Sequence, residues 1–362
     1  MIGSIMLCAT MAAALLLRRK AEPAASRTLA AFIALACVAA VPNLIGFAGA
    51  YDVWPGLTFL PTETFLLLGP LIVLHARALM VQSAQRGYTW LLAPGVVYWF
   101  YQLWAFSMLG GYEAKWAYNR AIHLPYVFPA VTGLTWVMIA GCVAYVWFLH
   151  RRYTAWLADN HSAKDRFDPT WLRHFILMAI AASGYWIAKS AISIWLQFDY
   201  FQNFVWDVMA LFFVFVIALE AQVGIHQKFP KMMEIKPETQ AANAPPPARD
   251  WKREGARLQA AVLEQRWYLD PNLSLQILSR RYGMNHVYLS RSINEGLECN
   301  FNGFINKLRV DYARELIENG DTRSLTNIAL ASGFGSKASF NRAFKLHVGI
   351  SPSQYRARTV ST

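Results

Sequence analysis

The sequence predicts an all-α protein with two parts: a seven-span transmembrane helical bundle, and after it a cytoplasmic all-helical domain with two helix-turn-helix units. Apolar residues make up 56% of the 362 residues and charged residues only 15%, which is too apolar for an ordinary soluble protein of this length. The apolar residues gather in long segments over the first two thirds of the chain. The last third has short helical patterns separated by glycines and polar capping residues.

Seven segments of the first part are apolar enough to be membrane helices. A helix needs about 20 mostly apolar residues to cross a hydrocarbon core of about 30 Å. The first segment has its basic cluster after the apolar run, which is the reverse of a secretory signal, so we expect it to remain as a helix. The predicted spans are residues 2–17, 29–49, 58–79, 89–109, 126–149, 171–196 and 204–226.

The basic residues of the connections predict the orientation of these spans. If the N-terminus lies outside, the outer connections contain only Lys115 and Arg120, and the other basic residues of the connections fall on the inner side. An excess of Lys and Arg marks the cytoplasmic side of a membrane. The predicted location is therefore a bacterial inner (cytoplasmic) membrane, with several passes, the N-terminus outside and the C-terminal domain in the cytoplasm.

The chain is expected to divide at a linker. Residues 228–250 are rich in Pro, Ala and polar residues and show no helical periodicity, which is typical of a semi-rigid linker. They separate a seven-helix transmembrane sensor domain, residues 1–227, from a helical domain, residues 251–362. Residues 241–362 hold 17 of the 34 basic and 10 of the 22 acidic residues, so they carry +7 of the total charge of +12. This end of the chain is expected to meet an anionic partner.

Two helix-turn-helix patterns follow the linker. Ser274 is a suitable N-cap, Gly283 ends the helix that it begins, and Asn285 caps the next helix. Ser324, Gly333 and Ser336 repeat this order later in the chain.

An amphipathic pattern from Phe301 to Ile317 predicts a long helix between the two units, of about 19 residues and so about 28 Å. Successive major-groove segments on one face of DNA lie about 34 Å apart, so a rigid helix of this length is suited to hold two DNA readers one turn apart.

The second unit contains a specific sequence signature. It comprises Ile328, Ala329, Gly333, Phe334, Ser336, Phe340, Arg342, Phe344, Lys345, Gly349, Ser351, Pro352, Tyr355 and Arg356. This pattern resembles that of the AraC/XylS-type transcription regulators, and the resemblance covers about residues 255–358. It implies that residues 251–362 are an AraC-type DNA-binding domain that controls transcription initiation, with double-stranded promoter DNA and RNA polymerase as partners.

The first unit departs from the family pattern. Ile293 and Asn294 stand where the family tends to have Phe-Lys. Glu298 stands where a glycine is expected, and Gly296 comes two residues early. We therefore expect DNA readout to depend less on this half.

The resemblance also implies which side chains face the bases: His286, Val287, Ser290 and Arg291 in the first unit, and Lys337, Ala338, Asn341 and Arg342 in the second. Arginine pairs with guanine and asparagine with adenine through two hydrogen bonds, which favours Arg342, Asn341 and Arg291 as base readers. Lys337, Lys345 and Arg280 are better suited to contact phosphates. The alternative for each basic residue is a solvated helix face. Phe334, Phe340 and Phe344 are predicted to be core residues.

Three ionisable residues inside the predicted spans form a candidate signal site: Glu63, Lys189 and Asp207. Charged groups are costly in lipid and usually face a bundle interior. A structural ion pair is the alternative for these residues. The sequence contains no catalytic constellation, no CxxC pair and no cluster with metal-ligand spacing, so we expect no enzyme activity, no cofactor and no metal site.

Together these patterns predict a membrane-embedded, sequence-specific DNA-binding transcription regulator that senses an extracytoplasmic or membrane signal, with the lipid bilayer and a small-molecule or membrane signal as further partners. The rival interpretation is a transporter-like or receptor-like membrane protein whose helical tail binds a partner protein. The signal, the promoters and the choice between activation and repression stay open. A homodimer also stays open, because no heptad run predicts one.

Overall fold

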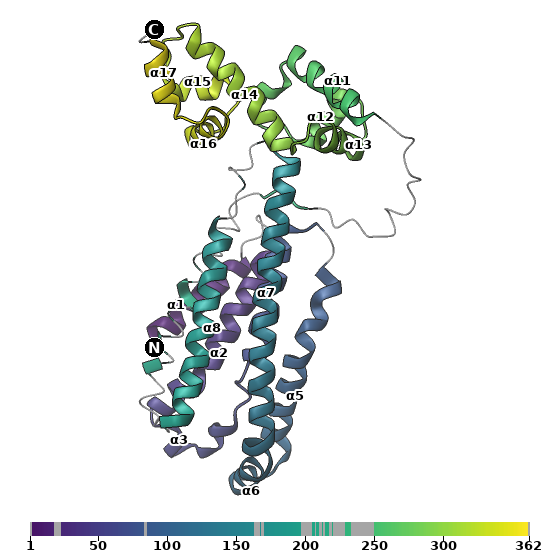
Figure 1. Ribbon diagram of the computed structural model, residues 1–362. Helices are drawn as coiled ribbons and strands as arrows, with labels where there is room; N and C mark the ends of the chain where they lie inside the picture. Colours follow the sequence, from purple (N-terminus) through teal and green to yellow (C-terminus); the bar gives the residue numbers. More distant parts are fainter. Residues whose placement is uncertain are drawn as a thin grey trace. The chain divides into compact units, whose positions relative to one another are not determined.

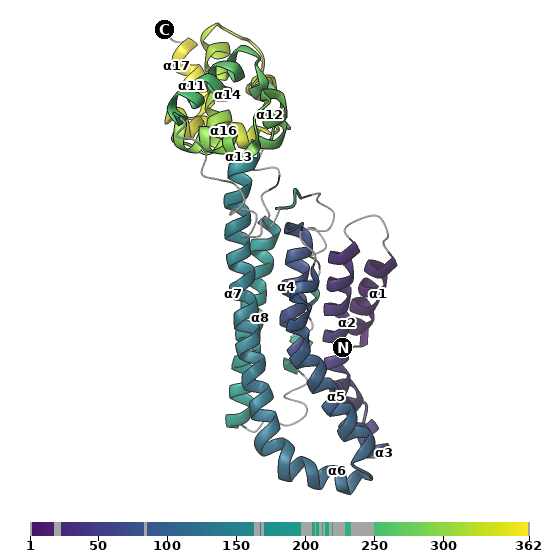
Figure 2. The same ribbon diagram turned by 90° about the vertical axis from the view of Figure 1, so that its right-hand side faces the viewer.

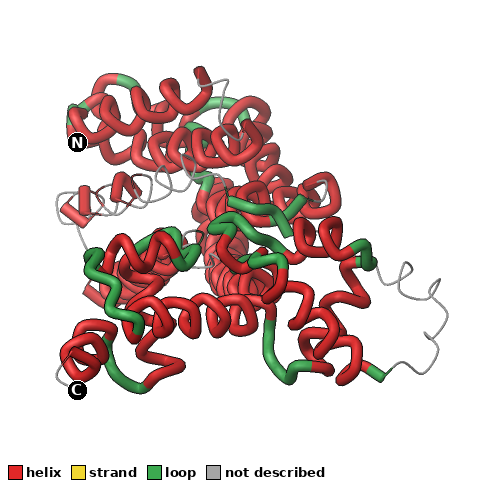
Figure 3. Tube along the Cα trace, turned by 90° about the horizontal axis from the view of Figure 1, so that it is seen from above, coloured by secondary structure: helices red, strands yellow, loops and turns green. Residues whose placement is uncertain are grey.

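Helices joined by loops make up the part that the structure describes (Figures 1 and 3). The chain forms two compact units, one of Met1–Arg151 with Pro169–Glu234, the other of Arg152–Asp168 with Ile235–Thr362. The prediction of an all-α protein is confirmed. The computed structural model describes residues 2–17, 23–82, 85–162, 167, 170–196, 205, 206, 208, 209, 212, 214–216, 219, 229–232 and 250–360.

The first unit is built from helices of very different length. In Figure 2, α2 lies between α1 and α4, and it packs against both. Ala25, Leu29, Ile33 and Ala36 of α2 are buried at helical spacing, and their modest size lets neighbouring helices approach closely. The elements are α1 (Ile2–Leu17), α2 (Pro23–Phe47), α3 (Ala50–Val53), η1 (Pro55–Phe59), α4 (Phe65–Met80), η2 (Gln85–Leu92), α5 (Ala93–Met108), α6 (Tyr112–Tyr118), η3 (Asn119–Val127), α7 (Phe128–Asn160) and α8 (Thr170–Leu196).

The prediction of seven membrane spans is wrong. Among the described residues, two helical segments are long and apolar enough to cross a membrane: Pro23–Gly46, near the N-terminus, and Tyr112–Asn160, of whose most apolar window only 11% is buried. Helices α1, α4 and α5 each have 16 residues. Their length of about 24 Å is less than the hydrocarbon thickness of about 30 Å. The predicted span 204–226 lies largely outside the described residues.

Breaks in the helices explain this error. The predicted span 58–79 becomes a helix only at Phe65, because the preceding residues form η1 and a non-helical segment that contains Pro61. The predicted span 89–109 becomes α-helical only at Ala93, because η2 occupies its beginning. Hydropathy reports how apolar a segment is, but not whether one continuous helix runs through it.

The second unit contains the two predicted helix-turn-helix patterns. Figure 1 shows α14 running between α11–α13 on one side and α15–α17 on the other. Besides the end of α7, the elements are α11 (Trp251–Glu264), η5 (Trp267–Leu269), α12 (Leu275–Tyr282), α13 (His286–Arg291), η6 (Ser292–Gly296), α14 (Phe301–Glu318), α15 (Leu325–Ala331), α16 (Lys337–Val348) and α17 (Pro352–Val360).

The predicted capping residues are confirmed. The Ser274 hydroxyl accepts a hydrogen bond from the amide of Ile277 at 3.3 Å, and the Asn285 side chain accepts one from the amide of Val287 at 2.8 Å. Gly283 ends α12 with a φ of +73°. The caps of the second helix-turn-helix pattern are formed in the same way, because Ser324 and Ser336 each accept an amide hydrogen bond at 3.2 Å.

Helix α14 belongs to two hydrophobic cores. Its first half contributes Phe301, Phe304, Ile305 and Leu308 to a core with α11, α12 and α13. Its second half, from Val310 to Ile317, contributes to a core with α15 and α16. The second core contains the three predicted core phenylalanines, Phe334, Phe340 and Phe344, each at most 2% exposed.

Glu298 and Gly296, where the first helix-turn-helix pattern departs from the family pattern, have different local structures. Glu298, at the position where the family has glycine, has a φ of +54°, so a residue with a side chain occupies the left-handed region. Gly296 has a different role, because an added Cβ would lie only 2.1 Å from the carbonyl oxygen of Trp251. This glycine therefore allows α11 to pack directly on η6.

We predict that substitutions at Gly296 and Glu298 have opposite effects on local stability. Gly296→Ala should destabilise the contact between α11 and η6 by about 2–3 kcal/mol, because the added methyl meets backbone. Glu298→Gly should stabilise it by about 0.5–1 kcal/mol, since relief of the left-handed strain exceeds the added chain entropy. Amide hydrogen exchange over residues 292–301 in the full chain measures both. Equal effects of the two substitutions would contradict this explanation.

Candidate nucleic-acid interface

Helix α16 has one buried and one exposed face. Phe340, Ala343 and Phe344 are buried in the second core. The predicted base and phosphate contacts on this helix are all exposed: Lys337, Ala338, Asn341, Arg342 and Lys345. Their spacing of three or four residues places them along one side of the helix. The burial of the phenylalanines thus fixes which polar side chains face solvent.

Helix α13 presents a smaller surface. His286 and Val287 are exposed in its first turn, directly after the Asn285 cap, and Ser290 is half-buried. Leu289 is fully buried and orients the helix. The end of this helix continues into η6, which begins at Ser292.

Arg291 already contacts other side chains of the C-terminal region. Its Nε lies 2.7 Å from one Glu295 carboxylate oxygen, and Nη2 lies 3.3 Å from the other. This hydrogen-bonded pair raises the pKa of the guanidinium. The guanidinium also lies 4.6 Å from the ring centroid of Trp251, on α11. A contact from Arg291 to a base would have to replace its bond to Glu295.

Arg280, the predicted phosphate contact of the first helix-turn-helix pattern, is exposed on α12. The next residue, Arg281, forms an ion pair with Asp270 at 2.6 Å. Neighbouring arginines of one helix thus have different surroundings, and sequence spacing alone does not distinguish them.

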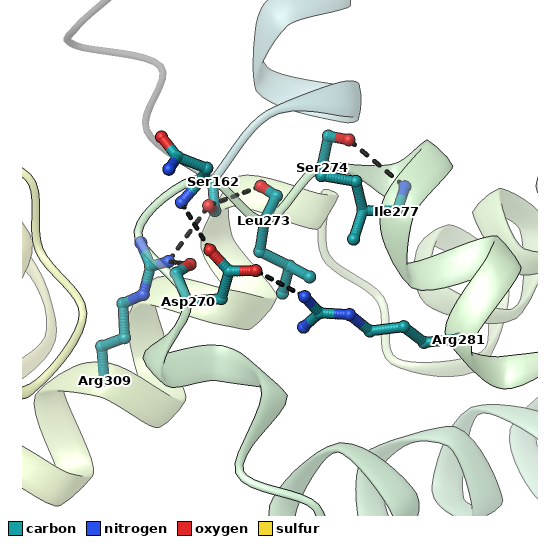
Figure 4. A network of polar contacts seen from close by, with 8 residues as sticks. Ser162, Asp270, Leu273, Ser274, Ile277, Arg281 and Arg309 are labelled. Atoms are coloured by element: carbon teal, nitrogen blue, oxygen red, sulfur yellow. Dashed lines mark hydrogen bonds and ion pairs between the residues drawn. The ribbon is translucent and has the colours of Figure 1, made fainter.

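A buried arginine lies between the two cores. Arg309 is 1% exposed, at the middle of α14. Its Nε donates to the carbonyl oxygen of Tyr268 at 2.6 Å, and Nη2 donates to that of Asp270 at 2.7 Å. Nη2 also donates to the hydroxyl of Ser162 at 3.1 Å (Figure 4). The guanidinium is therefore satisfied by two backbone carbonyls and one side chain from other segments.

Burial lowers the pKa of Arg309 to about 10, and the nearby Asp270 partly opposes this shift. The guanidinium consequently keeps its charge at neutral pH. It also lies 5.7 Å from the ring centroid of Phe334, which belongs to the second helix-turn-helix pattern.

The turn of the second helix-turn-helix pattern approaches the same segment of the chain. Gly333 has a φ of +83°, and an added Cβ would lie 2.8 Å from the carbonyl oxygens of Tyr268 and Leu269. Only glycine permits this approach. Arg309 and Gly333 together hold the segment before α12 against the turn between α15 and α16.

Sequence reasoning missed Arg309, although a signal was present. The residue falls at a spacing of four from Ile305 and Ala313, which are both fully buried. A charged residue on the apolar stripe of an amphipathic helix indicates a buried polar contact. Sequence reasoning also missed Ser162 and Asn302, for which no local pattern gives a signal.

The candidate signal site of the first unit is described only in part. The Glu63 carboxylate accepts a hydrogen bond from the Tyr98 hydroxyl, and the Glu63 backbone exchanges two hydrogen bonds with the Gln102 side chain, at 2.9 and 3.1 Å. These described partners lie on α5. Lys189 is half-buried on α8, and Asp207 lies outside the described residues.

Comparison with known proteins identifies the C-terminal region. A family model described as a helix-turn-helix domain matches residues 278–358, which include α13, α14, α15 and α16. An Escherichia coli protein, the melibiose operon regulatory protein, is 29% identical over 87 residues. Residues 278–358 form an AraC-type helix-turn-helix domain. This class of domain is that of transcription regulators.

The relatives match the AraC-type domain over a limited region. An uncharacterized HTH-type transcriptional regulator of Staphylococcus aureus is 39% identical over 85 residues, which are 24% of this chain and 11% of that protein. The E. coli match covers 24% of this chain and 28% of that protein. A solved Listeria innocua structure of unknown function is 30% identical, covers 28% of this chain and 93% of its own, and has a TM-score of 0.26. The chain thus spans much less than two thirds of the curated relatives that it matches.

We predict that Arg309→Ala destabilises the AraC-type domain by roughly 3–5 kcal/mol, because it removes the buried hydrogen bonds to the carbonyls of Tyr268 and Asp270 and leaves a cavity in their place. Arg257→Ala is the matched control, since that exposed arginine pairs across the α11 surface with Glu254 and should change stability by at most about 0.5 kcal/mol. Hydrogen exchange of the helices on both sides of α14, in the full chain, measures the two effects. Equal losses would contradict the assigned role of Arg309.

Proposed function

We propose that this protein is a sequence-specific DNA-binding transcription regulator, and that α16 and α13 of its AraC-type domain read promoter DNA. The observation that carries the proposal is the exposed face of α16. Asn341, Arg342 and Lys345 are exposed on this helix, whereas Phe340 and Phe344 are buried. Asparagine and arginine can each pair with a base edge through two hydrogen bonds, and lysine supplies a phosphate contact.

The geometry between the two helix-turn-helix patterns supports this proposal. Helix α14 has 18 residues and is about 27 Å long, and it carries one helix-turn-helix pattern on each half. Readers about one DNA turn apart need a rigid spacer of comparable size, because successive major-groove segments are about 34 Å apart. The bonds of Arg309 give α14 that rigidity at its centre.

The charge of the C-terminal region and the names of its relatives also support the proposal of DNA binding. Residues 241–362 carry a net charge of +7, which favours binding to a polyanion. The melibiose operon regulatory protein is, by its name, a regulator of an operon. We infer that the present chain acts on transcription in the same general way, with RNA polymerase as the further partner.

DNA binding by the full chain tests the proposal, with DNA enriched from a random-sequence library. Arg342→Ala should weaken binding to the enriched sequence by about 1–3 kcal/mol and should change binding to scrambled DNA much less, because it removes base discrimination. Lys345→Ala should weaken binding to both DNAs alike and reduce the salt dependence by about one counterion. A fluorescence anisotropy titration at several salt concentrations measures these changes.

Arg257→Ala is again the control, because this exposed arginine lies on α11, outside the proposed reading helices. It should leave the affinity for enriched and scrambled DNA nearly unchanged. If the full chain retains no DNA in a salt-dependent manner, the regulator proposal fails. A helical tail that binds a partner protein would then be the better explanation.

We propose further that the first unit attaches the regulator to a membrane, where it senses an extracytoplasmic or membrane signal. Two apolar helical segments, Pro23–Gly46 and Tyr112–Asn160, support attachment. Large apolar side chains on α7 point outward, among them Val137 at 70% exposed and Phe148 at 60%. An exposed apolar surface of this kind suits a lipid environment better than water.

The proposed signal site comprises Glu63, Lys189 and Asp207. The hydrogen bonds that Tyr98 and Gln102 make to Glu63 support a fixed, exposed carboxylate at this position. A carboxylate held in this way favours a signal with a cationic or hydrogen-bond-donating group.

A charge placed on the exposed face of α7 tests membrane attachment. Val137→Lys should lower the amount of chain that resists alkaline extraction from membranes, because a lysine in lipid costs about 2.5–3.5 kcal/mol on insertion scales. Leu263→Lys, at a residue of α11 that is 44% exposed, should leave this amount unchanged. Equal membrane retention of both variants, or release of the unmodified chain by alkaline extraction, would rule out attachment through this face.

A further inference from the structure

Ser162 is fully engaged in the second unit although it lies more than one hundred residues upstream of the AraC-type domain. Its hydroxyl donates to the carbonyl oxygen of Leu273 at 2.7 Å and accepts from Arg309 at 3.1 Å. Its amide donates to the same Leu273 carbonyl at 3.2 Å. Figure 4 shows these groups converging on the segment before α12. Ser162 is 3% exposed, so these bonds are shielded from water.

Asn302, near the start of α14, holds the same segment from a second direction. Its side-chain amide donates to the carbonyl oxygens of His161 and Ser162, at 3.1 and 2.8 Å. Its side-chain oxygen in turn accepts from Asn306 at 3.1 Å. His161 and Ser274 also form an antiparallel backbone bridge. The segment is therefore seated by backbone and side-chain contacts together.

The segment follows directly after α7. Helix α7 ends at Asn160, and its residues from Arg152 onward belong to the second unit, whereas its earlier residues belong to the first. His161 also contacts the ring of Trp156, in the last turns of α7, with ring centroids 5.5 Å apart. One continuous helix therefore supplies residues to both units.

We propose that Ser162 is a positioning residue for DNA reading, and that the seat of His161 and Ser162 on the AraC-type domain is the contact through which α7 influences that domain. This inference rests on the proposed DNA-binding function. Ser162 acts through Leu273, whose neighbour Ser274 caps α12, and through Arg309, which holds α14. The seated segment fixes the start of the first helix-turn-helix pattern relative to the spacer helix.

The coupling is reciprocal. If the seated state binds DNA more tightly than the released state, then bound DNA must stabilise the seat by the same factor. Release of the segment removes both donors from the Leu273 carbonyl and one acceptor from Arg309.

The amide of Ser162 reports the seat directly, because its acceptor is the Leu273 carbonyl. Hydrogen exchange of the full chain, followed with and without enriched DNA, should show this amide exchanging at least about fivefold more slowly when DNA is bound. Ser162→Ala and Asn302→Ala should each weaken binding of the enriched DNA by about fivefold or more in the full chain. Ser353→Ala, which removes an exposed hydroxyl of α17, should leave the affinity unchanged.

The outcomes separate this inference from the function on which it rests. DNA binding with unchanged exchange of the Ser162 amide overturns the inference alone, and so does unaltered affinity of the Ser162→Ala and Asn302→Ala variants. Absence of DNA binding by the unmodified chain overturns both. The exchange measurement needs no substitution, so a variant that fails to fold does not remove the test.

Discussion

The arrangement of the second unit depends on the buried guanidinium of Arg309. The residue divides α14 between two hydrophobic cores, with Leu308 in one core and Val310 in the other. Removing a guanidinium from water is costly, and here backbone carbonyls and a hydroxyl compensate with directed hydrogen bonds. An apolar side chain would fill the same space, but it would remove the hydrogen bonds that Arg309 donates to the carbonyls of Tyr268 and Asp270.

This constraint gives the two proposed reading helices different properties. Helix α16 presents Asn341 and Arg342 on an exposed face, because Phe340 and Phe344 hold its other face in the core. Helix α13 presents less, since Arg291 is held by Glu295 and lies against Trp251. The second half is thus the better candidate for base discrimination. The first helix-turn-helix pattern is the better candidate for control of DNA binding, because the segment that Ser162 contacts leads directly into it.

Sequence reasoning succeeded where the determinants are local. The caps at Ser274 and Asn285 and the buried phenylalanines follow from nearest neighbours and helical spacing. The expected glycine at Glu298 likewise marked a left-handed backbone position, although another residue occupies it. Sequence reasoning failed where continuity or distance matters: hydropathy did not reveal the breaks before Phe65 and Ala93. No local pattern could place Ser162 beside Arg309, because 147 residues separate them.

The central claim is that one rigid spacer helix, held at Arg309, sets two DNA readers about one helical turn apart. A hydroxyl-radical footprint of the full chain on enriched DNA tests this most directly. The account predicts two protected segments on one face of the duplex, with centres about 10–10.5 base pairs apart, and stronger protection where the second helix-turn-helix pattern binds. A single protected segment, or two segments whose spacing varies from one bound sequence to another, would contradict it.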